Sequence, residues 1–121
     1  MRMNEQLRKE ELIREKLNKE YGKNFKKSKV KLEGIEEEWE ADLVSDDGTI
    51  VGEIKTADYK GKPGTAIPRN LCSPYIFLKN AVGAKKRLLI YTKKKLYDHV
   101  IKSREGKLAI NDGIEIILME I

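Results

Sequence analysis

The sequence contains few of the residues that build covalent or metal-bound frameworks. It has one cysteine and one histidine in 121 residues. A single thiol cannot form an internal disulfide and has no companion for a thiolate metal site, and the lone His99 lies far along the chain in an expected helix. We therefore expect Cys72 to lie in the core or beside it, and the protein to work in a reducing environment.

Long apolar stretches are also missing. Nothing approaches the ~20 apolar residues of a membrane-spanning helix, and the N-terminal residues MRMNEQLRKEE lack the apolar segment of a secretory signal. These absences predict a soluble, cytoplasmic protein with no membrane partner. With 121 residues and 40% hydrophobic content, the chain is long enough for one core, and we expect residues 1–121 to form a single domain.

Charge is plentiful and unevenly distributed. Charged residues make up 37% of the chain, the net charge is +5, and residues 33–47 contain eight acids and no base. Basic residues cluster in KNFKKSKVK (23–31), YKGKPGTAIPRN (59–70) and AKKRLLIYTKKK (84–95). A basic body suits a polyanion such as nucleic acid, although each cluster taken alone is equally compatible with a solubilising surface.

Apolar periodicity and turn residues predict an alternating set of helices and strands. A helix over residues 4–21 carries an apolar seam that includes Leu7 and Leu17 and is interrupted by Glu10. The pattern further predicts strands over 29–33, 39–45, 49–56, 87–92 and 114–121, helices over 73–83 and 94–104, and a long loop between 56 and 73; residues 107–111 are compatible with a helix or a strand. This order predicts an α/β sandwich with a mixed sheet.

The hairpin around Asp46, Asp47 and Gly48 has a predictable register. A two-residue or four-residue turn places Asp42 opposite Glu53 and Glu40 opposite Lys55 on one face of the strands. The other face, which the apolar pattern predicts to be the core side, then carries Trp39, Ala41, Leu43, Ile50, Gly52 and Ile54.

Directly opposed acids repel each other unless positive charge lies between them. Lys55, diagonal to Asp42, is one candidate, and a divalent cation is the other; carboxylate oxygens are hard ligands that suit Mg²⁺ or Mn²⁺. Glu10, on the apolar side of its helix, likewise needs a partner or a cation. The alternative for Glu10 is an ion pair with Arg14 at a solvent-exposed helix edge.

These residues resemble the PD-(D/E)XK nuclease superfamily. Asp42, a gap of ten residues and then Glu53-Ile54-Lys55 on the next strand match its motif, and the resemblance extends over about residues 5 to 92. It implies a restriction-endonuclease-like, Holliday-junction-resolvase-like α/β/α sandwich with a central mixed sheet in the order αβββαβ(α)β. Ala41 stands where the motif has proline, which is the one named departure.

The resemblance also implies roles for the motif residues. Asp42 and Glu53 are expected to bind Mg²⁺ or Mn²⁺, and Lys55 to orient or activate the attacking water. Glu10 is the expected glutamate from the first helix, ahead of Glu11 and Glu20. The implied activity is metal-dependent endonucleolytic cleavage of DNA, selected by DNA structure or targeted by a partner.

The basic residues complete the expectation. Lys60, Lys62 and Arg69 follow the catalytic strand and are expected to position the nucleic-acid backbone, together with Lys85, Lys86 and Arg87. Cutting both strands of double-stranded or branched DNA needs two sites, which makes a homodimer plausible. Three alternatives remain open: an inactive nucleic-acid-binding module on the same fold, a basic protein-interaction subunit, and an ordinary hairpin crossed by a Glu40–Lys55 pair.

Overall fold

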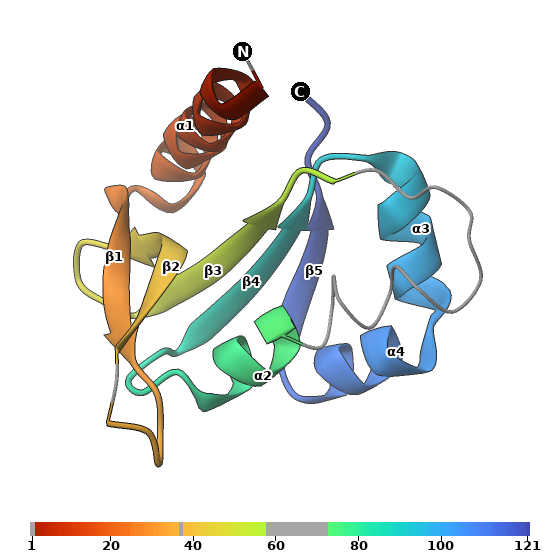
Figure 1. Cartoon of the computed structure of the whole chain (residues 1–121). Coiled ribbons are helices and arrows are strands. Elements are labelled where there is room, and N and C mark those ends of the chain that lie inside the picture. The colour runs from red at the N-terminus through yellow and green to blue at the C-terminus, as the bar shows by residue number, and fades with distance from the viewer. Residues whose placement is uncertain (1, 37, 58–72) are drawn as a thin grey trace.

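The computed structural model describes residues 2–36, 38–57 and 73–121 (Figure 1). Its elements are α1 (Arg2–Tyr21), β1 (Phe25–Lys31), β2 (Glu38–Ser45), β3 (Ile50–Lys55), α2 (Ser73–Asn80), β4 (Lys86–Tyr91), α3 (Lys94–Lys102), α4 (Arg104–Asn111) and β5 (Ile114–Leu118). The predicted order is therefore present with one additional helix, because residues 107–111 belong to α4. No helix in the described ranges is both long enough and apolar enough to cross a membrane.

The five strands form one open mixed sheet in the order β1-β2-β3-β4-β5. β1, β2 and β3 pair antiparallel, whereas β3, β4 and β5 pair parallel. The change of direction follows from the connections. A short turn joins β2 to β3, and parallel strands need longer crossovers, which here contain helices.

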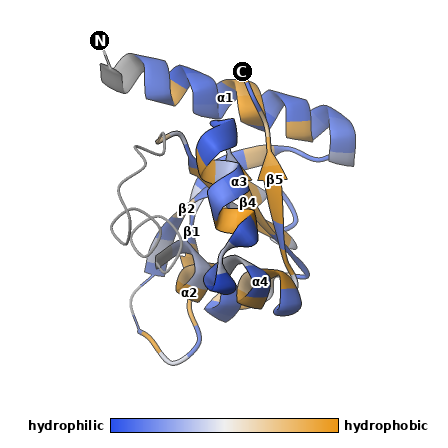
Figure 2. Ribbon diagram, turned by 90° about the vertical axis from the view of Figure 1, so that its right-hand side faces the viewer, coloured by the Kyte–Doolittle hydropathy of each residue, from blue (hydrophilic) through white to orange (hydrophobic). Residues whose placement is uncertain are grey.

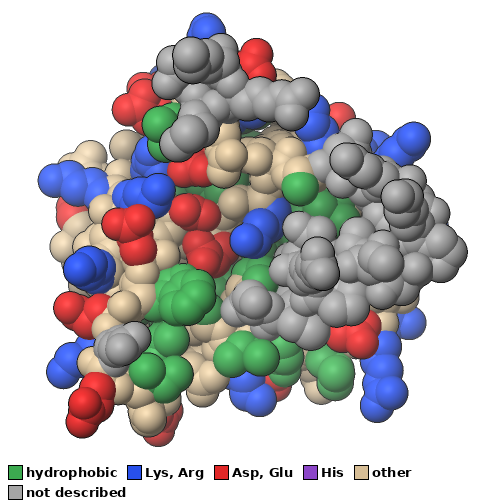
Figure 3. All heavy atoms as spheres, in the orientation of Figure 1, with side chains coloured by type: hydrophobic (Ala, Val, Ile, Leu, Met, Phe, Trp, Pro, Cys, Tyr) green, Lys and Arg blue, Asp and Glu red, His purple; other side chains and the backbone are tan. Residues whose placement is uncertain are grey.

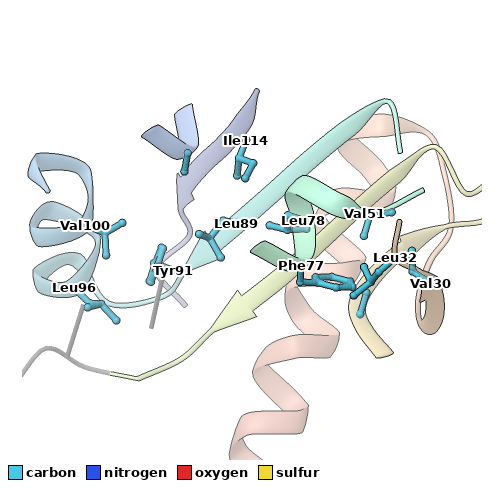
Figure 4. Packing of buried hydrophobic residues seen from close by; sticks show 13 residues of the cluster. Val30, Leu32, Val51, Phe77, Leu78, Leu89, Tyr91, Leu96, Val100 and Ile114 are labelled. Atoms are coloured by element: carbon cyan, nitrogen blue, oxygen red, sulfur yellow. The ribbon is translucent and has the colours of Figure 1, made fainter. Parts of the chain in front are cut away.

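Helices cover both faces of this sheet. Side chains of the central strands point alternately to the two faces, so each face has its own apolar cluster that a helix must cover. Ile13 and Leu17 of α1 pack with Ile54 on one face. The other face packs against α2, α3 and α4 (Figure 4), in a cluster that includes Val30, Leu32, Val51, Phe77, Leu78, Leu89, Tyr91, Leu96, Val100 and Ile114. The result is an α/β arrangement with helices on the two sides of a mixed sheet, as the sequence predicts.

The hairpin between β2 and β3 has the predicted register, with Leu43 opposite Gly52. Side chains in the turn fix its geometry. Asp47 Oδ1 accepts hydrogen bonds from Ser45 Oγ at 2.7 Å and from the backbone N of Thr49 at 3.1 Å. These contacts hold a four-residue turn and so confirm the register.

The prediction that Trp39, Ala41 and Leu43 share one face is wrong. The pairing of β1 with β2 shifts, so that Asp42 and Leu43 together oppose a single residue of β1. Such a β-bulge reverses the alternation of side chains. Leu43 packs on the α1 side, Ala41 packs on the α2 side, and Trp39 lies against Phe77 of α2 with 5.7 Å between ring centroids.

The predicted apolar seam of α1 is also partly wrong. Ile13 and Leu17 are fully buried, but Leu7 is 48% exposed. The N-terminal half of α1 lies beside a pocket lined by Gln6 and Glu10 instead of over the packed sheet, so Leu7 has no apolar surface to cover. The expected positions of Cys72 and of the long loop fall outside the described residues.

Gly106 at the junction of α3 and α4 provides a test of this packing. A Cβ at that position would lie 1.9 Å from the carbonyl oxygen of Val100, so neither helix can remain in place. We expect Gly106→Ala to lower the free energy of unfolding by at least about 2 kcal/mol. Thermal denaturation checks this, with the exposed neighbour Lys107→Ala as the control. Equal melting temperatures for the two variants would contradict the packing.

Candidate functional site

A pocket of about 590 Å³ opens where β2 and β3 separate, beside the N-terminal half of α1. In Figure 3, acidic side chains gather on this face next to a basic side chain and a group of hydrophobic ones. The pocket is lined by Gln6, Glu10, Lys27, Glu40, Asp42, Glu53, Ile54, Lys55, Thr56 and Ala57. Three elements thus bring all four predicted catalytic residues, Glu10, Asp42, Glu53 and Lys55, to one place.

The bulge in β2 creates this pocket. Backbone pairing between β2 and β3 reaches only as far as Leu43 and Gly52, and beyond that point two carboxylates bond the backbone instead. Asp42 Oδ2 accepts a hydrogen bond from the N–H of Ile54 at 2.9 Å. Glu53 Oε2 accepts one from the N–H of Asp42 at 3.2 Å. Each acid is therefore held by the backbone of the opposite strand.

Glu53 is buried with an acid as its neighbour, and both features oppose its ionisation. Its residue exposure is 7%. Desolvation, followed by the hydrogen bond and the charge of the Asp42 side chain, raises the pKa of Glu53 to about 8, while the charge of Lys55 acts in the opposite direction. Near neutral pH the metal-free protein thus keeps a proton between two carboxylates. A cation can take the place of that proton.

Glu10 is the most buried acid of the pocket, at 3% exposure. Gln6 Nε2 donates to its Oε2 at 3.3 Å, and Arg14 lies 3.9 Å from its Oε1. Oε1 has no hydrogen-bond partner although it is buried. The alternative ion pair with Arg14 is therefore present, but the expectation of a solvent-exposed helix edge is wrong. Glu11 and Glu20 are exposed and do not line the pocket.

Lys55 and Glu40 do not form the predicted cross-strand pair. Glu40 lies 3.8 Å from Lys27 of β1, and both side chains are about half exposed. The strands have separated before they reach this position, so Glu40 cannot lie opposite Lys55. Within the described part of the chain, Lys55 has no ion pair within 4.0 Å. Its ammonium group is therefore available to a ligand in the pocket.

The residues predicted to position the nucleic-acid backbone divide into two groups. Lys60, Lys62 and Arg69 lie outside the described residues. Arg87 donates to the carbonyl oxygens of Leu78 at 2.6 Å and Ala81 at 3.2 Å, so it stabilises the end of α2.

Lys86 is likewise engaged in the fold, with its Nζ 3.1 Å from Glu115 and above the ring of Tyr21. Lys86 and Arg87 also lie opposite Ile50 and Val51 at the start of β3, whereas the pocket is at its end. Neither is placed to bind a ligand in the pocket.

Sequence reasoning missed Gln6 and Lys27 as pocket residues. Gln6 has a readable signal, since it precedes Glu10 by one helical turn and so shares its face. Lys27 has none, because its place in the pocket depends on the bulge in the neighbouring strand. Lys27, whose side chain is 42% exposed, adds positive charge at the rim of the pocket.

The pocket residues fit a hard divalent cation. The available metal ligands are carboxylate oxygens, which hard cations prefer. The Oε1 of Glu10 is buried without a hydrogen-bond partner, and a cation would provide the missing interaction. Among the described residues, no three His, Cys, Asp or Glu side chains are already gathered as a metal site. Binding would therefore combine Asp42 and Glu53 with water or backbone oxygen, and requires release of the proton on Glu53.

Comparison of the chain with known protein families, with curated proteins and with solved structures gave no match in any of the three. The geometry of the pocket is thus the basis for inferring a function.

The proton held by Glu53 gives a testable effect on stability. The folded protein keeps this proton above the ordinary pKa of 4.5, so the contribution of Glu53 to stability is fully present below pH 4.5 and is lost as the pH rises to about 8. Glu53→Gln removes the ionisable group and keeps an acceptor for the N–H of Asp42. In metal-free buffer at pH 8 we expect the variant to be more stable by roughly 1–3 kcal/mol.

Denaturant unfolding of both proteins between pH 5 and pH 9 measures this effect. The stability difference should grow with pH for Glu53→Gln and stay flat for Glu38→Gln, an exposed acid of β2. A Glu53→Gln protein that is less stable than wild type at every pH would show that the carboxylate is ionised and favourably placed.

Proposed function

We propose that the protein is a divalent-metal-dependent endonuclease with a restriction-endonuclease-like fold, which hydrolyses phosphodiester bonds in DNA. One observation carries the proposal: Glu10 from α1, Asp42 from β2 and Glu53 and Lys55 from β3 line the same pocket. The element order and the helices on both faces of the mixed sheet support the fold.

The proposed mechanism assigns a task to each side chain. Asp42 and Glu53 would hold Mg²⁺ or Mn²⁺, and the Oε1 of Glu10, which is buried without a hydrogen-bond partner, would contact the ion or its water. The bound ion would supply a water of lowered pKa and neutralise charge on the phosphate. Glu53 must first give up its proton, and Lys55 promotes that loss because its positive charge lowers the pKa of Glu53.

Lys55 is also the residue placed to act on the reaction. Its charge has no carboxylate partner within ion-pair distance among the described residues, so it can orient the attacking water and stabilise negative charge on the phosphate. Lys27 at the rim would contact the substrate backbone, and such contacts position a duplex without reading its sequence. We therefore propose selection by DNA structure or by a partner protein.

Cleavage assays test the proposal. Plasmid, linear duplex and branched DNA are incubated with Mg²⁺, with Mn²⁺ and with a chelator. We expect cleavage with either ion and none with the chelator. Salt-sensitive binding without cleavage would instead identify an inactive nucleic-acid-binding module, and neither binding nor cleavage would favour a protein-interaction subunit.

A further inference from the structure

The two edges of the sheet differ in charge. β1 at one edge has lysine at four of its seven positions, Lys26, Lys27, Lys29 and Lys31. Lysines on an edge strand prevent it from pairing with another strand. β5 at the opposite edge, with the sequence IEIIL, has one charged residue, Glu115. Lys86 of β4 neutralises that charge at 3.1 Å, so β5 lacks the protection that β1 has.

The backbone of β5 has unused hydrogen-bonding groups on its outer side. The N–H of Met119 donates to the carbonyl oxygen of Tyr91 in β4 at 2.8 Å. Because N–H directions alternate along a strand, Ile114, Ile116 and Leu118 turn their N–H and C=O groups away from β4. No further strand pairs with this edge in the described ranges. Figure 2 looks onto this side and shows β5 in view along its length, with α3 and α4 to one side.

Partly exposed apolar side chains lie on β5 and on the neighbouring helix α4. Ile116, Ile117 and Leu118 are each only partly buried. Helix α4, which packs beside β5, exposes Leu108 and Ile110 at 47% and 48%. An apolar edge strand without protective charges is a site for strand pairing.

We propose that β5 is the dimer interface of this protein, and that two copies pair β5 with β5, antiparallel, about a two-fold axis at Ile116. The strand is complementary to itself in this register. Ile116 faces Ile116 of the second copy and Ile114 faces Leu118, so every outward N–H and C=O of the strand is paired. Glu115 faces Ile117, which avoids opposing two acids. This self-complementarity favours a second copy over a strand from another protein.

The mass of the protein in solution tests the proposal. The wild-type chain is expected to have twice its 13.9 kDa mass across a wide range of concentration. Leu118→Lys, which copies the protection of β1, should return it to 13.9 kDa. The control is Val82→Lys, 54% exposed and hydrogen-bonded to Lys31 of β1 at the opposite edge, which should leave the dimer intact.

A monomeric wild-type protein overturns the proposal, and β5 would then pair with a different partner. A dimer that Val82→Lys dissociates and Leu118→Lys does not also overturns the proposal. Circular dichroism of each variant separates loss of pairing from loss of folding. Since β4 lies between β5 and β3, the dimer and the nuclease site can fail independently.

Cross-linking tests the register even if Leu118→Lys fails to fold. The axis at Ile116 places its two Cα atoms about 5.5 Å apart, within the span of about 4.4–6.8 Å that a disulfide bridges. With Cys72→Ser in the background, oxidation should link Ile116→Cys chains in pairs and leave Ile117→Cys chains single. Linkage through position 117, or at neither position, overturns the register.

Discussion

Asp42→Asn is expected to reduce metal-dependent cleavage by about 10³-fold or more while the protein stays folded. The amide oxygen can still accept the hydrogen bond from the N–H of Ile54, which Asp42 Oδ2 accepts at 2.9 Å in the wild type. The change removes the negative charge that binds a cation, and it keeps the size of the side chain and its hydrogen bond to β3. Single-turnover cleavage of a labelled duplex, with Mn²⁺ and at saturating protein, measures the loss.

Asp46→Asn is the matched control for this variant. Asp46 is an exposed acid in the turn of the same hairpin and does not line the pocket. It should retain wild-type cleavage. Cleavage that persists in Asp42→Asn at the wild-type rate would mean that the activity comes from elsewhere, either another site or a contaminating nuclease.

Lys55→Met is expected to lower the cleavage rate by about 10²–10³-fold and to leave cation binding in place. Methionine keeps much of the length of the side chain, so the end of β3 should pack as before. Two effects combine in the loss. The transition state loses a positive charge, and the pKa of Glu53 rises further because the charge of Lys55 lowers it in the wild type. The residual activity should therefore require a higher pH than that of the wild type.

Lys27→Met separates this role from general attraction of DNA. Lys27 lines the same pocket from β1 and is 42% exposed, paired with Glu40. Its loss should weaken DNA binding a few-fold and reduce the salt dependence, with the single-turnover rate at saturation unchanged. Equal losses of that rate in the two variants would show that Lys55 acts only as one of several surface charges.

The register of the hairpin could be predicted because it depends on local chemistry. The turn residues from Ser45 to Thr49 fix the loop, and the alternation of apolar and charged residues fixes which positions face each other. The helices and most strands followed from the same local signals. The sequence predicts a first strand over residues 29–33, whereas β1 spans Phe25–Lys31, because the stretch KKSK contains no apolar alternation from which to predict a strand.

The shape of the pocket could not be predicted in this way. The bulge at Asp42 and Leu43 depends on how β1 pairs with β2, and neither residue type marks a bulge. It sends Trp39 and Ala41 to the α2 side and ends the ladder, so that Asp42 and Glu53 bond the backbone of opposite strands.

The sequence marks Glu10 as unusual but does not predict what surrounds it. A charged residue on the apolar side of α1 indicates a partner, and the sequence offered both Arg14 and a cation. The structure contains the Arg14 contact at 3.9 Å and also leaves Oε1 buried without a hydrogen bond. Which acids of other elements lie near it depends on packing between distant segments, which a single sequence does not specify.

Diffraction from crystals grown with Mn²⁺ at a pH above the pKa of Glu53, which is about 8, tests the central claim most directly. We predict an anomalous scattering peak in the pocket about 2.1 Å from a carboxylate oxygen of Asp42 and one of Glu53. The account would be contradicted by a pocket without Mn²⁺ in which the two acids still contact each other.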